Sequence, residues 1–212
     1  MQGVGGGDSP TPFFVMICLG ITGGIGTGKS ECAAHLGRLG IRVLDTDDVA
    51  RVLVEPGQPA LNEIVQAFGQ AVIDGSGRLD RAALGARVFS DAAARERLET
   101  ILHPRIFAEW TRWIARSRAC PGIRVAAVVI PLLYEKAYAG HFDAVAAIAC
   151  STGTQVRRLR GRGWSDQVIE SRLAAQWPTP EKFRKADFGL WSEGCLEVLH
   201  QQVQAVLESL AA

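Results

Sequence analysis

Residues 16–30 read MICLGITGGIGTGKS, and this stretch decides the fold. Residues 17–21 form a short apolar run typical of a buried strand. Residues 23–30 match the pattern G-x-x-x-x-G-K-[ST] at every fixed position. From residue 29 to residue 39, apolar side chains then recur at helical spacing. A strand, a glycine-rich turn and a helix in this order predict a phosphate-binding loop at the start of an α/β domain.

The residues of this loop suit a bound polyphosphate. Glycine lets the backbone bring its N–H groups close to phosphate oxygens, and the helix adds the positive end of its dipole. Lys29 is expected to bridge the β- and γ-phosphates of ATP, and the Ser30 hydroxyl to bind Mg²⁺. An accidental match is the alternative, and the flanking strand and helix disfavour it. The loop residues predicted to bind ATP are Gly24, Ile25, Gly26, Thr27, Gly28, Lys29 and Ser30.

The rest of the chain continues the α/β pattern. Runs of apolar residues that are not interrupted by polar ones are typical of strands in a parallel sheet, which is buried on both faces. Further strands are predicted at residues 41–44, 125–130, 144–149 and 186–190. The amphipathic spacing of residues 197–210 predicts a helix that closes the domain.

Two long helical stretches interrupt this alternation, and residues 153–185 are rich in arginine. We therefore predict an α/β fold: a P-loop NTPase core with a five-stranded parallel sheet, a helical substrate-binding insertion and a helical lid. Residues 1–15 are rich in glycine and proline, and we expect a disordered extension there. The predicted parts are the core (16–47, 120–152 and 186–212), the insertion (48–119) and the lid (153–185).

Composition excludes several classes of protein. A formal net charge of +1 gives no reason to expect nucleic acid or an anionic membrane as a partner. No apolar run reaches the roughly 20 residues of a membrane-spanning helix. The five cysteines are scattered without a C-x-x-C pair, so neither a zinc site nor a disulfide framework is predicted, and a cytoplasmic location fits best. The sequence does not predict the oligomeric state.

Acidic residues are needed beside the phosphates, and the sequence offers one obvious source. The single asparagine, Asn62, excludes the Asn-Lys-x-Asp element of guanine recognition, which argues against a GTPase. The strand at 125–130 ends at Pro131 instead of an acid, so it supplies no ordinary Walker-B aspartate. Asp45 and Asp47, at the end of the second strand, remain.

Two interpretations of this acidic pair stay open. If the strand tip is extended, Asp45 and Asp47 point to the same side, and the adjacent strand is expected to be the one that enters the phosphate loop. One carboxylate would then accept the proton of the acceptor hydroxyl, while the other holds a Mg²⁺-bound water. Alternatively, the segment is a solvated loop in which Asp47 or Asp48 caps the next helix.

Six motifs in order give the chain a recognisable family pattern. The phosphate loop follows Thr22; Asp45, Asp47 and Arg51 form D-x-D-x-x-x-R; and Glu55-Pro56-Gly57 follows. Later come Leu102-His103-Pro104, Pro131-Leu132-Leu133-Tyr134-Glu135, and a lid pattern with Gln155, Arg158, Arg162, Arg172, Gln176 and Ala186-Asp187-Phe188. With these motifs, residues 16–207 resemble the dephospho-coenzyme A kinase family.

The resemblance implies transfer of the ATP γ-phosphate to the ribose 3′-hydroxyl of dephospho-coenzyme A, giving coenzyme A and ADP. It implies that Asp47 is the base or hydroxyl-orienting residue, with Lys29, Arg158 and Arg162 as the other catalytic residues. Arg158 would also bind ATP, and Asp45 would hold Mg²⁺ through water. The substrate-binding residues it implies are Thr22, Asp45, Asp47, Arg51, His103, Leu133, Tyr134 and Glu135.

Plainer roles remain open for several of these residues. The lid arginines Arg158 and Arg162, four apart and hence on one helical face, could be part of a solvated basic surface. Arg51 could form an ion pair with a helix neighbour such as Glu55, and Glu135 could lie on a surface helix. His103 precedes Pro104, which fits a helix that starts with proline and favours a structural role or a substrate contact. Separately, Trp110 and Trp113 are predicted to pack in the core of the insertion.

The chain departs from the family pattern at Gly189-Leu190-Trp191-Ser192-Glu193, which puts the adenine contacts in question, and Trp191 is a candidate for stacking there. A smaller departure is Gly163-Trp164 after the lid arginine. Two other functions stay possible: a P-loop kinase of another small-molecule or nucleotide acceptor, and a nucleotide-dependent switch without an acceptor.

Overall fold

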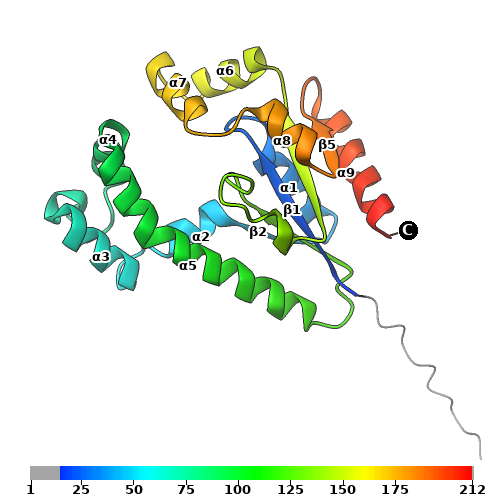
Figure 1. Cartoon of the computed structure of the whole chain (residues 1–212), viewed down its shortest axis with the longest axis horizontal. Helices are drawn as coiled ribbons and strands as arrows, with labels where there is room; N and C mark the ends of the chain where they lie inside the picture. The colour runs from blue at the N-terminus through cyan, green and yellow to red at the C-terminus, as the bar shows by residue number, and fades with distance from the viewer. Residues whose placement is uncertain (1–14, 212) are drawn as a thin grey trace, which may run out of the picture.

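The protein is described by a computed structural model over residues 15–211, in which a five-stranded parallel sheet has the order β2-β3-β1-β4-β5 (Figure 1). The predicted α/β fold class is confirmed. The fifth strand begins two residues later than predicted, and the expected disordered extension lies outside the described residues except for Val15. The strands are β1 (Ile17–Gly23), β2 (Arg42–Asp45), β3 (Val125–Val129), β4 (Ala144–Ala149) and β5 (Phe188–Trp191).

Helices cover both faces of the sheet, because alternate residues of each strand face opposite sides. Leu19 and Ile21 of β1 face helices α1 (Lys29–Arg38) and α9 (Leu196–Ala211), whereas Cys18 faces the other side. Both faces of β1, β3 and β4 are buried, as uninterrupted apolar runs predict for a parallel sheet.

The insertion is helical and forms a small core of its own. Its helices are α2 (Thr46–Val52), α3 (Pro59–Phe68), α4 (Arg81–Ser90) and α5 (Ala92–Arg118), with a short 3₁₀ helix, η1 (Gln70–Val72). Trp110 of α5 is 1% exposed and packs with Cys18 and Val128 of the sheet, so it joins the insertion to the core. Trp113 lies partly buried against the same cluster.

The segment that we predicted to be the lid contains α6 (Thr152–Arg160), α7 (Asp166–Ala174) and α8 (Thr179–Lys185). Figure 1 shows α6 and α7 at the end of the sheet where β1 runs into the phosphate loop. A second short 3₁₀ helix, η2 (Ala139–His141), precedes β4. Within residues 15–211, every helix is too short or too polar to cross a membrane.

The strand order corrects one prediction. The strand beside β2 is β3, with Asp45 opposite Val129, so β3 lies between β2 and the strand that enters the phosphate loop. The tip of β2 is also not extended, because Thr46 already starts α2. The Thr46 hydroxyl donates to the Val129 carbonyl at 2.8 Å, which fixes this turn at the end of β3.

Gly189 in β5 gives a test of how tightly the lid packs on the sheet. A Cβ added there would overlap the ring of Phe183 in α8, whereas a Cβ at Gly37 in α1 would meet no atom within 4 Å. We expect Gly189→Ala to lower the free energy of unfolding by about 1–3 kcal/mol, as overpacking does. Gly37→Ala, the control, should be neutral or stabilising by up to about 1 kcal/mol. Urea unfolding of both variants measures this, and equal midpoints would contradict the packing.

Candidate active site

The phosphate loop joins β1 to α1 and presents backbone N–H groups at the start of the helix. Gly23, Gly26 and Gly28 have φ values of 150°, 77° and 104°, which non-glycine residues rarely adopt. The Thr27 hydroxyl donates to the Gly24 carbonyl at 2.8 Å and fixes the curvature of the loop. An anion at this position meets amides of the loop and the positive end of the α1 dipole.

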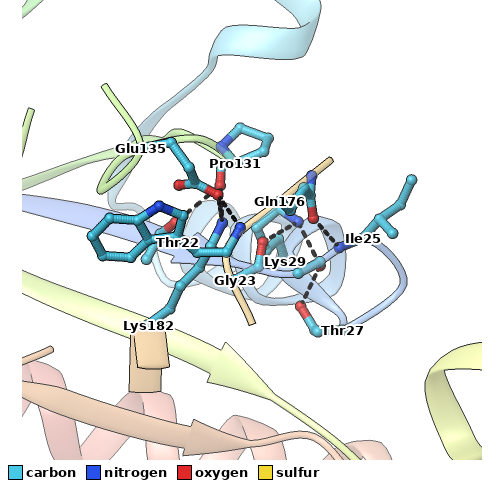
Figure 2. Close-up of polar contacts among 11 residues, drawn as sticks. Thr22, Gly23, Ile25, Thr27, Lys29, Pro131, Glu135, Gln176 and Lys182 are labelled. Carbon is cyan, nitrogen blue, oxygen red and sulfur yellow. Dashed lines mark hydrogen bonds and ion pairs between the residues drawn. The ribbon is translucent and has the colours of Figure 1, made fainter. Parts of the chain in front are cut away.

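Lys29 is folded over the same loop. Its ammonium group donates to the Gly23 carbonyl at 3.0 Å, as Figure 2 shows, and to the Gly24 carbonyl at 2.9 Å. An ammonium group has three protons, so one remains for a phosphate oxygen. Burial lowers the pKa of Lys29 to about 8, and the carboxylate of Asp47 is the largest influence in the opposite direction.

This pKa predicts how ATP affinity depends on pH. Nucleotide phosphates favour charged Lys29, so binding raises its pKa. Below pH 8 the group is already charged and affinity is flat; above pH 8 binding must take up a proton, and affinity falls by up to about tenfold per pH unit. Titration calorimetry from pH 7.5 to pH 9.5, in buffers of different ionisation enthalpy, should detect this proton uptake. An ATP affinity that stays constant over this range would contradict it.

Asp45 and Asp47 lie at the start of α2. One carboxylate oxygen of Asp45 accepts the Asp47 amide at 2.9 Å, so Asp45 caps the helix, and the interpretation of Asp47 or Asp48 as the cap is wrong. Burial is the main cause that raises the pKa of Asp45 above its ordinary value. The charges of both carboxylates act on Lys29 despite the intervening β3.

A cavity of about 600 Å³ follows the phosphate loop. We call it the phosphate cavity. Residues from the loop, the β2 tip, the lid and the segment after β5 line it, including Lys29, Ser30, Asp45, Asp47, Arg51, Arg158, Arg162 and Ser192. The structure therefore brings together most residues that the sequence assigned to phosphate chemistry.

A second cavity of about 510 Å³ lies between the insertion and the end of β3. We call it the acceptor cavity. Its walls include His103, Phe107 and Trp110 of α5, and Pro131 after β3. The residues that line both cavities are Ile25, Lys29, Asp47 and Arg172. A ligand in the phosphate cavity and a ligand in the acceptor cavity would therefore be adjacent at Lys29 and Asp47.

The lid arginines face the phosphate cavity, although not from one helical face as predicted. Arg158 donates to the Gly26 carbonyl at 3.3 Å and to the Ser192 hydroxyl at 3.0 Å, and also to the Ser192 carbonyl. Arg162 lies beyond the end of α6, which stops at Arg160. The turn after α6 returns Arg162 to the same cavity.

Thr22, Leu133, Tyr134 and Glu135 line neither cavity. Thr22 and Leu133 are 0% exposed, and the Thr22 hydroxyl donates to the Pro131 carbonyl at 3.3 Å. Tyr134 packs on Trp177 with parallel rings. Glu135 pairs with Lys182 at 2.6 Å, so its interpretation as a surface helix residue is wrong.

Arg51 lines the phosphate cavity and pairs with Asp48, whereas Glu55 pairs with Arg78. The alternative of an ion pair between Arg51 and a helix neighbour is therefore confirmed, although the partner is Asp48 and not Glu55.

Pro104 does not start a helix. It lies inside α5, whose N-terminal cap is Asp91. His103 therefore projects from the middle of this helix into the acceptor cavity, and mainly burial lowers its pKa.

Other residues of the site were given no role from the sequence. Arg172 of α7 lines both cavities, and Gln176 accepts the Ile25 amide at 2.9 Å (Figure 2). Their only signal was their position in the lid pattern. Ser192 carries the Arg158 contacts, while Trp191 does not line the phosphate cavity. Trp191 instead contacts Phe183 edge to face.

Comparison with known proteins agrees with this geometry. The model of the family described as "Dephospho-CoA kinase" matches residues 17–197. This chain belongs to the dephospho-CoA kinase family. A dephospho-CoA kinase of Chromobacterium violaceum is 43% identical over 189 residues, covering 88% of this chain and 91% of that protein. One from Anaeromyxobacter dehalogenans is 43% identical over 196 residues, covering 92% of each chain.

A solved structure has the same fold. The crystal structure of TT1252 from Thermus thermophilus superimposes with a TM-score of 0.76 at 35% identity, covering 92% of this chain and 98% of that one. The dephospho-CoA kinase from Campylobacter jejuni, at 24% identity and a TM-score of 0.67, supports the fold alone. This chain is thus a P-loop kinase of the dephospho-CoA kinase family over nearly its whole described length.

The donors in the phosphate cavity suit a magnesium ion. Ser30, Asp45 and Asp47 supply a hydroxyl and two carboxylates, and Mg²⁺ prefers such oxygen ligands while it keeps several waters. One carboxylate oxygen of Asp45 accepts the Asp47 amide, and a carboxylate has a second oxygen that can meet a magnesium ion or a water bound to it.

Proposed function

We propose that this chain transfers the γ-phosphate of ATP to the ribose 3′-hydroxyl of dephospho-coenzyme A, giving coenzyme A and ADP, the last step of coenzyme A biosynthesis. The observation that supports it is the pair Lys29 and Asp47, which lines both the phosphate cavity and the acceptor cavity. The phosphoryl group has only to cross this shared boundary. We also propose that the cytoplasm is where this takes place.

In this proposal the loop amides and Lys29 hold the β- and γ-phosphates. Asp47 accepts a hydrogen bond from the acceptor hydroxyl and thereby orients the hydroxyl oxygen toward the γ-phosphorus. The transition state of phosphoryl transfer is loose, so positioning of the nucleophile matters more than early removal of its proton.

The lid supplies positive charge and excludes water. A guanidinium group has five N–H donors, so Arg158 can keep its contacts with Gly26 and Ser192 and still reach a phosphate oxygen. Arg162 adds a second guanidinium in the same cavity. Stabilisation of the developing charge speeds phosphoryl transfer, and exclusion of water favours the acceptor over hydrolysis.

Magnesium would be held by Ser30 directly and by Asp45 through water. When bound, it neutralises charge on the β- and γ-phosphate oxygens. We further propose that residues 48–119 form the insertion that binds dephospho-coenzyme A, with His103 contacting it in the acceptor cavity, and that residues 153–185 act as the lid. We propose that Arg51, which lines the phosphate cavity together with Asp47, binds a phosphate of the acceptor.

A coupled assay of ADP release tests the proposal. Dephospho-coenzyme A should accelerate release strongly over ATP alone, whereas nucleosides and nucleoside monophosphates should not. Faster release with one of these other acceptors would instead indicate a kinase of another substrate. Slow hydrolysis that no acceptor accelerates would indicate a nucleotide-dependent switch. Mass spectrometry of the product should show one added phosphoryl group on dephospho-coenzyme A.

A further inference from the structure

Lys182 of α8 is a fully buried lysine in a helix that otherwise carries charges on its surface. Its side chain is 0% exposed. The ammonium group donates to the Pro131 carbonyl at 2.7 Å and pairs with Glu135 at 2.6 Å, as Figure 2 shows. Burial of an ammonium group is costly unless partners of good geometry surround it. Neither Lys182 nor Glu135 lines the phosphate cavity or the acceptor cavity.

Glu135 also binds a second part of the lid, at Trp177. The carboxylate oxygen that pairs with Lys182 also accepts the Trp177 amide at 2.9 Å. The residue before Trp177 is Gln176, whose side-chain oxygen accepts the Ile25 amide of the phosphate loop at 2.9 Å. The pair therefore anchors the lid segment that contacts the loop.

The Pro131 carbonyl is held from two sides. The Thr22 hydroxyl, at the end of β1, donates to it at 3.3 Å, and Lys182 donates to it from the lid. Pro131 itself is part of the wall of the acceptor cavity. One ion pair thus joins the strand that enters the phosphate loop, the acceptor wall and the lid.

The lid packs directly against the phosphate loop at Gly24. A Cβ at Gly24 would collide with the Thr179 hydroxyl and the Gln155 amide, both lid groups. Ile25, next in the chain, lines both cavities at their shared boundary. A small displacement of residues 176–182 would therefore move the loop where the phosphoryl group crosses.

We propose that Lys182 and Glu135 are a positioning pair that fixes the lid and the acceptor wall on the phosphate loop, and that the pair acts on transfer without contacting either substrate. The inference rests on the proposed kinase function. It assigns to the segment Pro131–Glu135 a role in orientation in place of the direct substrate contact that the resemblance implied.

The test compares Lys182→Met, which leaves Glu135 buried opposite an apolar chain, with the double variant Lys182→Met/Glu135→Leu. Replacing a buried ion pair by apolar residues of similar volume is often neutral for stability, whereas removal of one partner is not. The double variant should regain most of the urea stability lost in the single variant. Its kcat should still fall by at least about 10-fold, because slight misplacement of reacting groups is costly, with KM for ATP nearly unchanged.

A control pair lies elsewhere in the chain. Arg105 of α5 and Glu63 of α3 are ion-paired, and neither lines the phosphate cavity or the acceptor cavity. The double variant Arg105→Met/Glu63→Leu should leave kcat within about twofold of the unchanged protein, since pairs near the surface contribute little. If Lys182→Met/Glu135→Leu matches the unchanged protein in both urea stability and kcat, the pair does not position the lid and the inference is overturned.

Glu135→Gln keeps the volume and an acceptor oxygen and tests the inference even if the double variant does not fold. Its kcat should fall by at least about fivefold; an unchanged kcat would again overturn the inference. Every variant is measured with whichever acceptor the unchanged protein phosphorylates best. If dephospho-coenzyme A is not phosphorylated, only the proposed function is rejected. The role of the Lys182–Glu135 pair is decided separately, by the ratio of the kcat of each variant to that of the unchanged protein.

Discussion

Asp47→Asn is expected to lower acceptor-dependent ADP release by at least about 10²-fold, the lower end for general acid–base groups. The amide cannot accept the hydroxyl proton and presents a donor where the acceptor oxygen must lie. Because Asp47 lines both cavities, the loss should appear mainly in kcat, with modest change in KM for ATP. Steady-state kinetics with dephospho-coenzyme A measures it.

The control for this prediction is Asp48→Asn, the same chemical change one residue along. Asp48 is exposed, pairs with Arg51 and lines neither cavity. An exposed ion pair contributes at most about 1 kcal/mol, so activity should change by less than about fivefold. Near-full activity of Asp47→Asn would remove the aspartate from its role.

Lys29→Met should have the largest effect on the nucleotide side. Removal of one preorganised charge from a site where negative charge develops costs roughly 10²–10³-fold, and Lys29 also orders the loop through Gly23 and Gly24. We expect kcat/KM for ATP to fall toward the upper end of this range. The methionine fills the same space without the ammonium group, so the urea midpoint reports separately on folding.

Lys185→Met is the matched control for Lys29, because Lys185 is an exposed lysine near the surface of Trp177. It should retain ATP kinetics within about twofold, as surface substitutions usually do. Equal losses in the two lysine variants would show that the effect is one of overall charge, not of contact with phosphate.

Much of the fold is predictable from local pattern. Runs such as residues 144–149 contain no polar residue, which is typical of a strand buried on both faces, and the structure has a strand there. The phosphate loop is recognisable because its glycines are required by backbone conformation, as at Gly28 with φ 104°.

The errors arise where distant parts of the chain decide the local structure. In the order β2-β3-β1, the strand β3 lies between β1 and β2, the first two strands of the sequence. Nothing in the β2 sequence identifies β3 as its partner. The turn at Thr46 depends on a carbonyl 83 residues away, at Val129. Pro104 is accommodated inside α5, a helix of 27 residues that packs along the sheet.

The candidate site shows the same division. Arg158 and Asp47 were identified through the motifs that the chain shares with the dephospho-CoA kinase family, because their residue types and spacing alone left plainer roles open. Lys182 was not, since it lies in the charged run Glu181-Lys182-Phe183-Arg184-Lys185, which is typical of a solvated helix face. Only its tertiary contacts with Pro131 and Glu135 distinguish it from its neighbours.

A crystal structure with a non-hydrolysable ATP analogue, Mg²⁺ and dephospho-coenzyme A is the most direct test of where transfer occurs. We predict the γ-phosphate beside Lys29, with a carboxylate oxygen of Asp47 about 2.6–3.2 Å from the ribose 3′-hydroxyl, the distance of a productive hydrogen bond. A ribose bound outside the acceptor cavity, or Asp47 turned away from its hydroxyl, would contradict transfer at the boundary between the two cavities.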